Sequence, residues 1–227
     1  AHAGGSPHLG INALNAAHLA LAAIHAQRET FRDSDTVRVH PIITKGGSVV
    51  NSVPSDVRIE AYVRASNVPA ILRTSQKIDR AFRAGALATG ASVEISTTPG
   101  YLPAKYDSSL TKLYRQNAAS LIGEDNIIQL NHGTGCTDMG DVSQIVPTIQ
   151  PSANATTGSG HGVDYRVDNY ELAVTKAGKA MGMTLIDLLS ADGEKANEIS
   201  GSFDSPMTID GYLNRIRSFR STDTYEE

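Results

Sequence analysis

The residues best suited to chemistry are seven histidines, one cysteine and a few arginines with patterned neighbours. His18 and His25 are seven residues apart in a helix-like segment, whereas a zinc-binding histidine pair on a helix prefers a spacing of four. His40 alternates with apolar residues in a strand-like segment. The sequence therefore favours structural or surface roles for these three, and it assigns no role to His8 in the opening loop.

A second group of reactive side chains gathers in a glycine-rich segment. His132, Cys136 and Asp138 lie within a few residues of one another, and all three are common metal ligands. Their spacing is not that of a closed metal site, and no second pair of ligands accompanies them. A cysteine-dependent enzyme built on these three residues is one alternative hypothesis. No G-x-S-x-G motif supports a serine hydrolase.

Two further residues each allow two interpretations. His161 stands between two glycines, where a backbone can approach a ligand closely, but a catalytic zinc needs about three protein ligands. Arg64 lies on the polar face of a strand-like segment. It is either an exposed cation paired with Glu60 or a fork that holds a substrate carboxylate in two hydrogen bonds. The spacing leaves both interpretations open.

The composition excludes several classes of protein. The chain has 227 residues and a formal net charge of −4, which argues against a general binder of nucleic acid or anionic membrane. No apolar run approaches the ~20 residues of a membrane span. The single cysteine excludes an internal disulfide framework and favours a cytoplasmic location.

The first hundred residues show a regular order of elements. Apolar spacing predicts a helix over 11–28, and alternation predicts strands over 36–43 and 57–64. Asn67 is a plausible N-cap of the next helix, and a short strand is expected over 93–97. This order becomes a split β-α-β-β-α-β sandwich, the ferredoxin-like arrangement, if one strand precedes residue 1. The chain is therefore expected to start within a domain.

The remainder is less regular, and mixed α/β (α+β) is the fold class that the whole chain predicts. The expected elements are a helix over 110–121, a loop over 131–144, a buried strand over 144–149, a flexible loop over 152–162, a long helix over 169–189 and a terminal helix over 209–219.

Three ordered blocks carry a resemblance to a known family. They are Ala1-His2-Ala3-Gly4 at the start of residues 1–13, the Gly46-Gly47 to Asn51 and Pro54 block, and Gly135-Cys136-Thr137-Asp138-Met139-Gly140-Asp141-Val142-Ser143, followed by His161. Together they resemble the aminoacylase and carboxypeptidase family of metal-dependent amidohydrolases. The third block is similar to its aminoacylase-like dipeptidases, although Cys136 stands where serine is expected. The resemblance covers about residues 1–189.

The resemblance implies a division into three parts. Residues 1–100 would form a ferredoxin-like lid, or dimerisation, domain that lacks its first strand. Residues 101–190 would form the C-terminal part of a zinc-peptidase-like α/β catalytic domain. Residues 191–227 would be a polar tail with a terminal helix.

The resemblance also implies an activity and a role for each site residue. The activity would be hydrolysis of a small amide, an N-acyl amino acid or a dipeptide, with two divalent metal ions (zinc, or else manganese or cobalt). His2 would reach across a homodimer formed by the lid and stabilise the oxyanion. Asn51 and Arg64 would bind substrate, Arg64 at its carboxylate, and His161 would be the last metal ligand.

The chain departs from the family pattern in what it lacks. The other metal ligands and the catalytic glutamate of the family lie upstream of the lid. Here the only Glu-Glu pair is Glu226-Glu227, and no H-x-D or C-x-H pair occurs. We therefore expect this chain by itself to hold no metal and to be inactive. The alternatives to an incomplete hydrolase are a non-catalytic dimerisation or binding module and an inactive fragment.

Overall fold

A computed structural model describes residues 1–130 and 133–226. The described chain divides into two compact units, which are considered separately. Unit 1 comprises residues 1–103, 133–135 and 213–226, and unit 2 comprises residues 104–130 and 136–212. Helices and small antiparallel sheets make up both units, so the predicted mixed α/β class is confirmed. The three-part division at residues 100 and 190 stays a prediction.

Two long helices of unit 1 begin at asparagine caps. In α1 (Ala13–Gln27), the Asn12 side chain accepts hydrogen bonds from the first backbone N–H groups of the helix. In α2 (Val68–Leu87), the Asn67 side chain accepts from Ala70 N at 2.9 Å. Both predicted helices and the Asn67 cap are confirmed.

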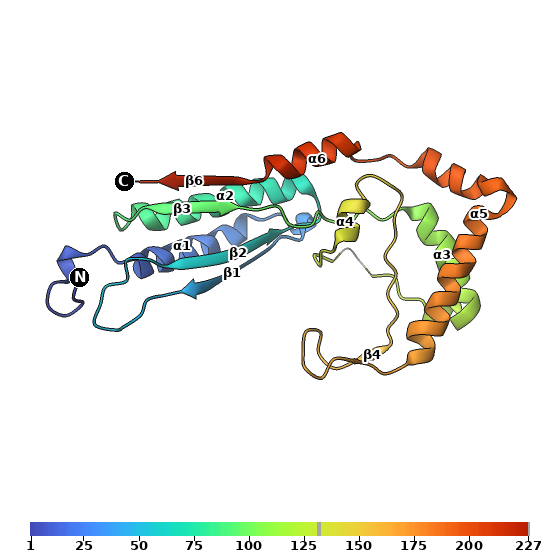
Figure 1. Cartoon of the computed structure of the whole chain (residues 1–227), viewed down its shortest axis with the longest axis horizontal. Helices are drawn as coiled ribbons and strands as arrows, with labels where there is room; N and C mark the ends of the chain where they lie inside the picture. Colours follow the sequence, from blue (N-terminus) through green and yellow to red (C-terminus); the bar gives the residue numbers. More distant parts are fainter. Residues whose placement is uncertain (131–132, 227) are drawn as a thin grey trace. The chain divides into compact units, whose positions relative to one another are not determined.

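The core of unit 1 lies where α1 and α2 meet the first two strands. Ile24 of α1 is fully buried and packs with Val39, Ile78 and Ala81. The two helices run side by side (Figure 1) and touch through Gly85, where an added Cβ would lie 2.3 Å from the Ala16 carbonyl oxygen. Only glycine allows this approach of the two backbones.

The first two strands form an antiparallel ladder. β1 (Arg38–Lys45) pairs with β2 (Arg58–Arg64), and Val39 opposite Val63 turns toward the helices. Both strands lie where alternation predicts them. The register shifts at the Lys45 end, where residues 46–57 connect β1 to β2. The outer face of this ladder carries the polar residues.

A second ladder joins distant parts of the chain. β3 (Val93–Thr97) has the predicted bounds, and its partner is β6 (Ser221–Tyr225), which the sequence pattern does not predict. The described strands of unit 1 thus form two separate two-stranded sheets. The single ferredoxin-like sheet that lacks its first strand stays a prediction.

Unit 2 is mainly helical. The predicted helices are confirmed as α3 (Ser108–Ile122), α5 (Ala177–Ser202) and α6 (Ile209–Ser218). A π-helical segment (Glu171–Lys176) precedes α5. Only the start of α6 belongs to unit 2, and its last residues belong to unit 1. Residues 190–193 of α5 have non-helical backbone angles, at the predicted end of the long helix. The other elements of unit 2 are α4 (Asp138–Val142), β4 (Thr156–Thr157), β5 (Arg166–Val167) and a 3-10 turn at Glu124–Asn126. Unit 1 also has 3-10 turns, at Pro7–Leu9, Arg28–Thr30 and Asp33–Asp35.

Two predictions for unit 2 are wrong. The loop expected over 131–144 contains α4, and the strand expected over 144–149 is absent from the described structure, because the backbone N–H groups of Ile145 and Val146 both donate to Val142 O at the end of α4. Polar side chains, not apolar ones, are buried there: the Ser143 hydroxyl donates to Gly140 O at 2.7 Å. The short apolar run therefore caps a helix.

No described helix combines the length and apolar character needed to cross a membrane.

Candidate functional site

The imidazole of His2 is fixed by the two glycines that follow it. Its Nδ1 accepts a hydrogen bond from Gly4 N at 3.1 Å and from Gly5 N at 2.9 Å. Since Nδ1 is an acceptor, the neutral ring carries its proton on Nε2. The side chain is exposed, so His2 presents an N–H donor to whatever approaches the surface.

Asn51 lies beside His2 on a neighbouring stretch of backbone. Ala3 N donates to Asn51 O and Val53 N donates to Ala1 O, both at 2.9 Å, and an isolated antiparallel bridge joins His2 to Ser52. The structure thus brings together two residues that the sequence singles out in separate blocks. We call residues 1–5 and 49–54 the tip of unit 1.

Arg64 is the last residue of β2. Its guanidinium donates to Thr134 O at 3.5 Å and lies 4.4 Å from the centre of the Tyr62 ring. No ion pair joins it to Glu60 in the described structure, so the alternative interpretation, a surface pair with Glu60, is not what holds this side chain. A guanidinium over an aromatic ring keeps its edge available for a carboxylate.

The tip and Arg64 lie at opposite ends of the β1–β2 ladder. Residues 46–57, which include part of the tip, join the Arg58 end of β2, and at roughly 3.3 Å per residue a seven-residue strand places its ends about 20 Å apart. A dipeptide extends over only about 7 Å. Within one chain, a single dipeptide therefore cannot contact both His2 and Arg64.

His161 lies in unit 2 in a tightly folded loop. Its backbone φ is +66°, a left-handed conformation that non-glycine residues rarely adopt. Gly162 N donates to Ser159 O at 2.7 Å, and the Asp164 carboxylate accepts from Ser159 N at 3.4 Å. Thr36, Ala191 and Asp192 also have a positive φ, so this conformation by itself assigns no role to His161.

The described residues do not by themselves fit a metal centre. Over residues 1–130 and 133–226, no group of three or more His, Cys, Asp or Glu side chains is arranged to hold a metal ion. The alternative built on His132, Cys136 and Asp138 depends on His132, which lies outside the described residues. Asp138 is the first residue of α4, where its carboxylate accepts from Met139 N at 3.1 Å.

Comparison with known proteins gives these residues a family context. Residues 1–89 match the family model of the M20 peptidase dimerisation domain. The chain is 34% identical over 198 residues to a mouse Xaa-Arg dipeptidase, an alignment that covers 83% of this chain and 45% of that protein. The chain belongs to the M20 family of aminoacylase- and dipeptidase-like proteins. The resemblance predicted from the three sequence blocks is therefore confirmed.

Two further relatives of this M20 chain set the extent of the likeness. The human Xaa-Arg dipeptidase is 33% identical over 198 residues, with 83% of this chain and 44% of that protein covered. An uncharacterized hydrolase, y4tI, from Sinorhizobium fredii is 25% identical over 150 residues, covering 64% of this chain and 37% of that protein. The chain thus spans less than half the length of the relatives that it matches.

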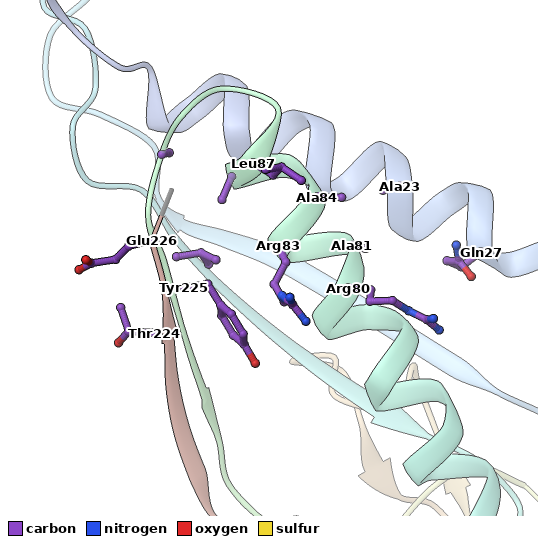
Figure 2. Close-up of a pocket in the computed structure, with 13 residues that line it drawn as sticks. Ala23, Gln27, Arg80, Ala81, Arg83, Ala84, Leu87, Thr224, Tyr225 and Glu226 are labelled. Atoms are coloured by element: carbon purple, nitrogen blue, oxygen red, sulfur yellow. The ribbon is translucent and has the colours of Figure 1, made fainter.

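An open groove of the M20 chain lies away from all four predicted site residues. α1, α2, β3 and β6 line it, and the Arg83 guanidinium points at the Tyr225 ring, 4.2 Å from its centre (Figure 2). None of His2, Asn51, Arg64 and His161 is among its lining residues. The groove is therefore a different place from the tip and from the end of β2.

The sequence patterns do not predict which residues lie next to Arg64. In the ladder, Arg38 is directly opposite Arg64, and His40 is directly opposite Tyr62. Alternation places each of these residues on the polar face of its own strand. The register of the ladder shows that Arg38 faces Arg64 and that His40 faces Tyr62. The sequences of two strand-like segments do not specify the register in which they pair.

Proposed function

We propose that this chain is the substrate-binding and dimerising part of an M20 hydrolase that cleaves the amide bond of dipeptides or N-acyl amino acids. The observation that carries the proposal is the fixed imidazole of His2 beside Asn51, at the tip of a unit that matches a peptidase dimerisation domain. The relatives named Xaa-Arg dipeptidases favour a dipeptide.

The chemistry that these residues can supply is binding and charge stabilisation. When an amide carbonyl is attacked, its oxygen gains negative charge, and a preorganised N–H donor stabilises that charge. The Nε2–H of His2 is such a donor, since two backbone hydrogen bonds orient its ring. The guanidinium of Arg64 would hold the substrate carboxylate, and the Asn51 amide would supply a further polar contact.

The proposed partner is a second copy of this chain. A substrate held by Arg64 of one chain is too short to reach His2 of the same chain, about 20 Å away along β2. His2 would therefore act on substrate bound in the other protomer. A homodimer through unit 1 satisfies this geometry and agrees with the matched dimerisation domain.

Peptidases of this family are generally metal-dependent. In the complete enzyme, His161 would be one ligand of two divalent ions (zinc, or else manganese or cobalt), which would supply Lewis-acid chemistry. A catalytic metal needs about three protein ligands, and the described residues do not supply the others. With a single cysteine, the cytoplasm is the proposed location.

Kinetics on the full enzyme test these roles. We expect His2→Ala to lower kcat by roughly 10²- to 10³-fold, as for loss of one oxyanion donor, with little change in KM. Arg64→Ala should raise KM strongly for substrates that carry a carboxylate and much less for their amides. A His2→Ala effect confined to KM, or an equal Arg64→Ala effect on acids and amides, would contradict the assigned roles.

A non-catalytic dimerisation module is the second candidate function. It is favoured by the family match over residues 1–89 and by the lack of a metal-binding group among the described residues. Zinc loading followed by dialysis and elemental analysis separates the two. A dimer that retains no zinc and hydrolyses no dipeptide fits the module, whereas two retained metal ions per chain with chelator-sensitive hydrolysis fit the enzyme.

A further inference from the structure

The outer face of the β1–β2 ladder carries two arginines at directly paired positions. Arg38 is opposite Arg64, and next to them His40 is opposite Tyr62, with ring centres 5.7 Å apart. The Val39–Val63 pair between them packs against the helices, so these four side chains face the other way. Paired positions bring Cβ atoms to within about 5 Å. We call these four residues the cationic face.

The positive charges of this face are not neutralised in the described structure. Like charges at paired positions destabilise a ladder. The Arg38 guanidinium donates to the backbone oxygen of Val37 at 2.9 Å, and that of Arg64 donates to Thr134 O. No ion pair of the described residues includes either arginine, and Glu60, the acid on this face, is paired across the ladder with Ile42.

Three other cations of unit 1 have an acid beside them. Lys45 and Arg58 share the Asp56 carboxylate at 2.6 and 3.2 Å, and Arg73 binds Asp35 at 2.8 Å. Lys45 of β1, Arg58 of β2 and Arg73 of α2 are therefore each paired with an acid of the chain, whereas in the described structure Arg38 and Arg64 are not. Two opposed guanidinium groups without such an acid leave a place for two anionic groups from outside the chain.

We propose that Arg38 is a specificity-determining residue that selects substrates with a second carboxylate. The inference rests on the proposed function, in which Arg64 holds the carboxylate of the substrate. Arg38 would then hold a side-chain carboxylate joined to the first by a short carbon chain, as in glutamyl or aspartyl residues. The Tyr62 ring, 4.4 Å from the Arg64 guanidinium carbon, gives that chain an apolar surface.

The same arrangement disfavours a basic residue at this position, so the selectivity proposed for this chain differs from the one that the name of its Xaa-Arg dipeptidase relatives states. The side chain of a C-terminal arginine or lysine would lie beside Arg38 and would meet like charge. A substrate with only one carboxylate would use Arg64 and leave Arg38 unpaired. The order of affinity expected on this face is therefore acidic first, neutral second and basic last.

Equilibrium binding to the full chain tests this order without metal or turnover. The probes are N-acetylglutamate, N-acetylglutamine and N-acetylarginine, titrated at low ionic strength and followed by isothermal calorimetry and by NMR of the β1–β2 amides. We expect N-acetylglutamate to bind roughly three- to tenfold more tightly than N-acetylglutamine, the range of one exposed charge-assisted contact. The difference should shrink in high salt.

Three variants test which arginine causes the preference for N-acetylglutamate. Arg38→Gln should remove the preference for N-acetylglutamate and leave N-acetylglutamine binding unchanged, whereas Arg64→Gln should weaken all three probes. Arg58→Gln is the matched control, since this exposed arginine of the same strand is engaged by Asp56, and it should change neither the affinities nor the preference.

The outcomes that overturn the proposal are distinct from failure of the proposed function. Equal affinity of the wild-type chain for N-acetylglutamate and N-acetylarginine overturns it, as does an unchanged preference in Arg38→Gln. If the preference depends on Arg38 but no form of the protein hydrolyses a dipeptide, the specificity of the face stands and the enzymatic role fails. The amide spectrum of each variant shows that it is folded.

Discussion

The two units bury different kinds of residue. In unit 1, large apolar side chains from both helices and β1 meet around Ile24. In the described part of unit 2, the buried residues are mostly alanines and polar side chains such as Ser143, Gln144 and Thr184. Large apolar residues of its helices are instead exposed, namely Val174, Met181, Leu185, Ile186 and Leu189.

The difference shows that helical periodicity and burial are separate properties. The spacing of apolar residues predicts α1 and the 169–189 helix equally well, and both are helices. Only α1 has its apolar stripe covered within its own unit. We therefore expect unit 1 to have most of the cooperative stability of the described chain, because burial of apolar area is the main favourable term in folding.

The largest contrast is expected between two truncations of apolar side chains. Ile24→Ala removes a fully buried side chain of unit 1 and should lower its free energy of unfolding by about 2–5 kcal/mol. Leu185→Ala in α5, at a site 55% exposed, should change stability by less than about 0.5 kcal/mol. Urea denaturation followed by circular dichroism measures both. Equal losses in the free energy of unfolding would contradict the expected difference in side-chain burial between the two units.

Alanine substitutions at Gly85 and Gly178 are expected to change stability by smaller amounts and in opposite directions. Gly85→Ala would push a methyl group against the Ala16 carbonyl oxygen and should cost about 1–3 kcal/mol. Gly178→Ala lies in α5 with no atom within 4 Å of the added Cβ, so the gain in helix propensity should stabilise it by roughly 0.5–1 kcal/mol. Thermal denaturation of each variant tests the signs. A stabilising Gly85→Ala would mean that α1 and α2 separate freely.

The smallest change in stability is expected from Asp79, a residue of α2 in unit 1. Burial raises the pKa of Asp79, repulsion from Asp223 raises it further, and Arg83 partly opposes both. Because the pKa of Asp79 is raised in the folded state, the contribution of its carboxyl group to stability is complete below the ordinary pKa of 3.8. This contribution is lost as the pH rises through the pKa of the folded state. Asp79→Asn should therefore raise the free energy of unfolding at pH 7, and the gain should vanish at low pH.

Denaturation of Asp79→Asn at a series of pH values from about 3 to 7, which spans the titration of a carboxyl group, measures this dependence. Asp223→Asn is the matched variant, since it removes the repulsion from the other side of the pair. In that background, Asp79→Asn should have a smaller effect than in the wild-type chain. A gain that does not depend on pH would exclude ionisation of Asp79 as its cause.

Much of the fold could be predicted from local patterns. The bounds of β3 and the Asn67 cap follow from alternation and from capping chemistry, which depend on neighbouring residues only. β6 could not be predicted, because its sequence Ser-Thr-Asp-Thr-Tyr has no apolar alternation and it forms only by pairing with β3. The strand expected over 144–149 failed because a short apolar run does not distinguish a strand from a helix cap.

The candidate site could be predicted in type but not in geometry. The sequence blocks single out His2, Asn51, Arg64 and His161. That Gly4 and Gly5 orient the His2 ring depends on backbone N–H groups, which leave no signature in side-chain types. The pairing of Arg38 with Arg64 depends on a register set by tertiary contacts. The roles of all four predicted residues stay predictions.

The pairing of β3 with β6 has a consequence for how the protein is made. Synthesis proceeds from the N-terminus at about 5–20 residues per second, and Val93 is paired with Tyr225, about 130 residues later. The free edge of β3 therefore waits on the order of ten seconds for its partner after it leaves the ribosome. During that interval it is open to neighbouring nascent chains.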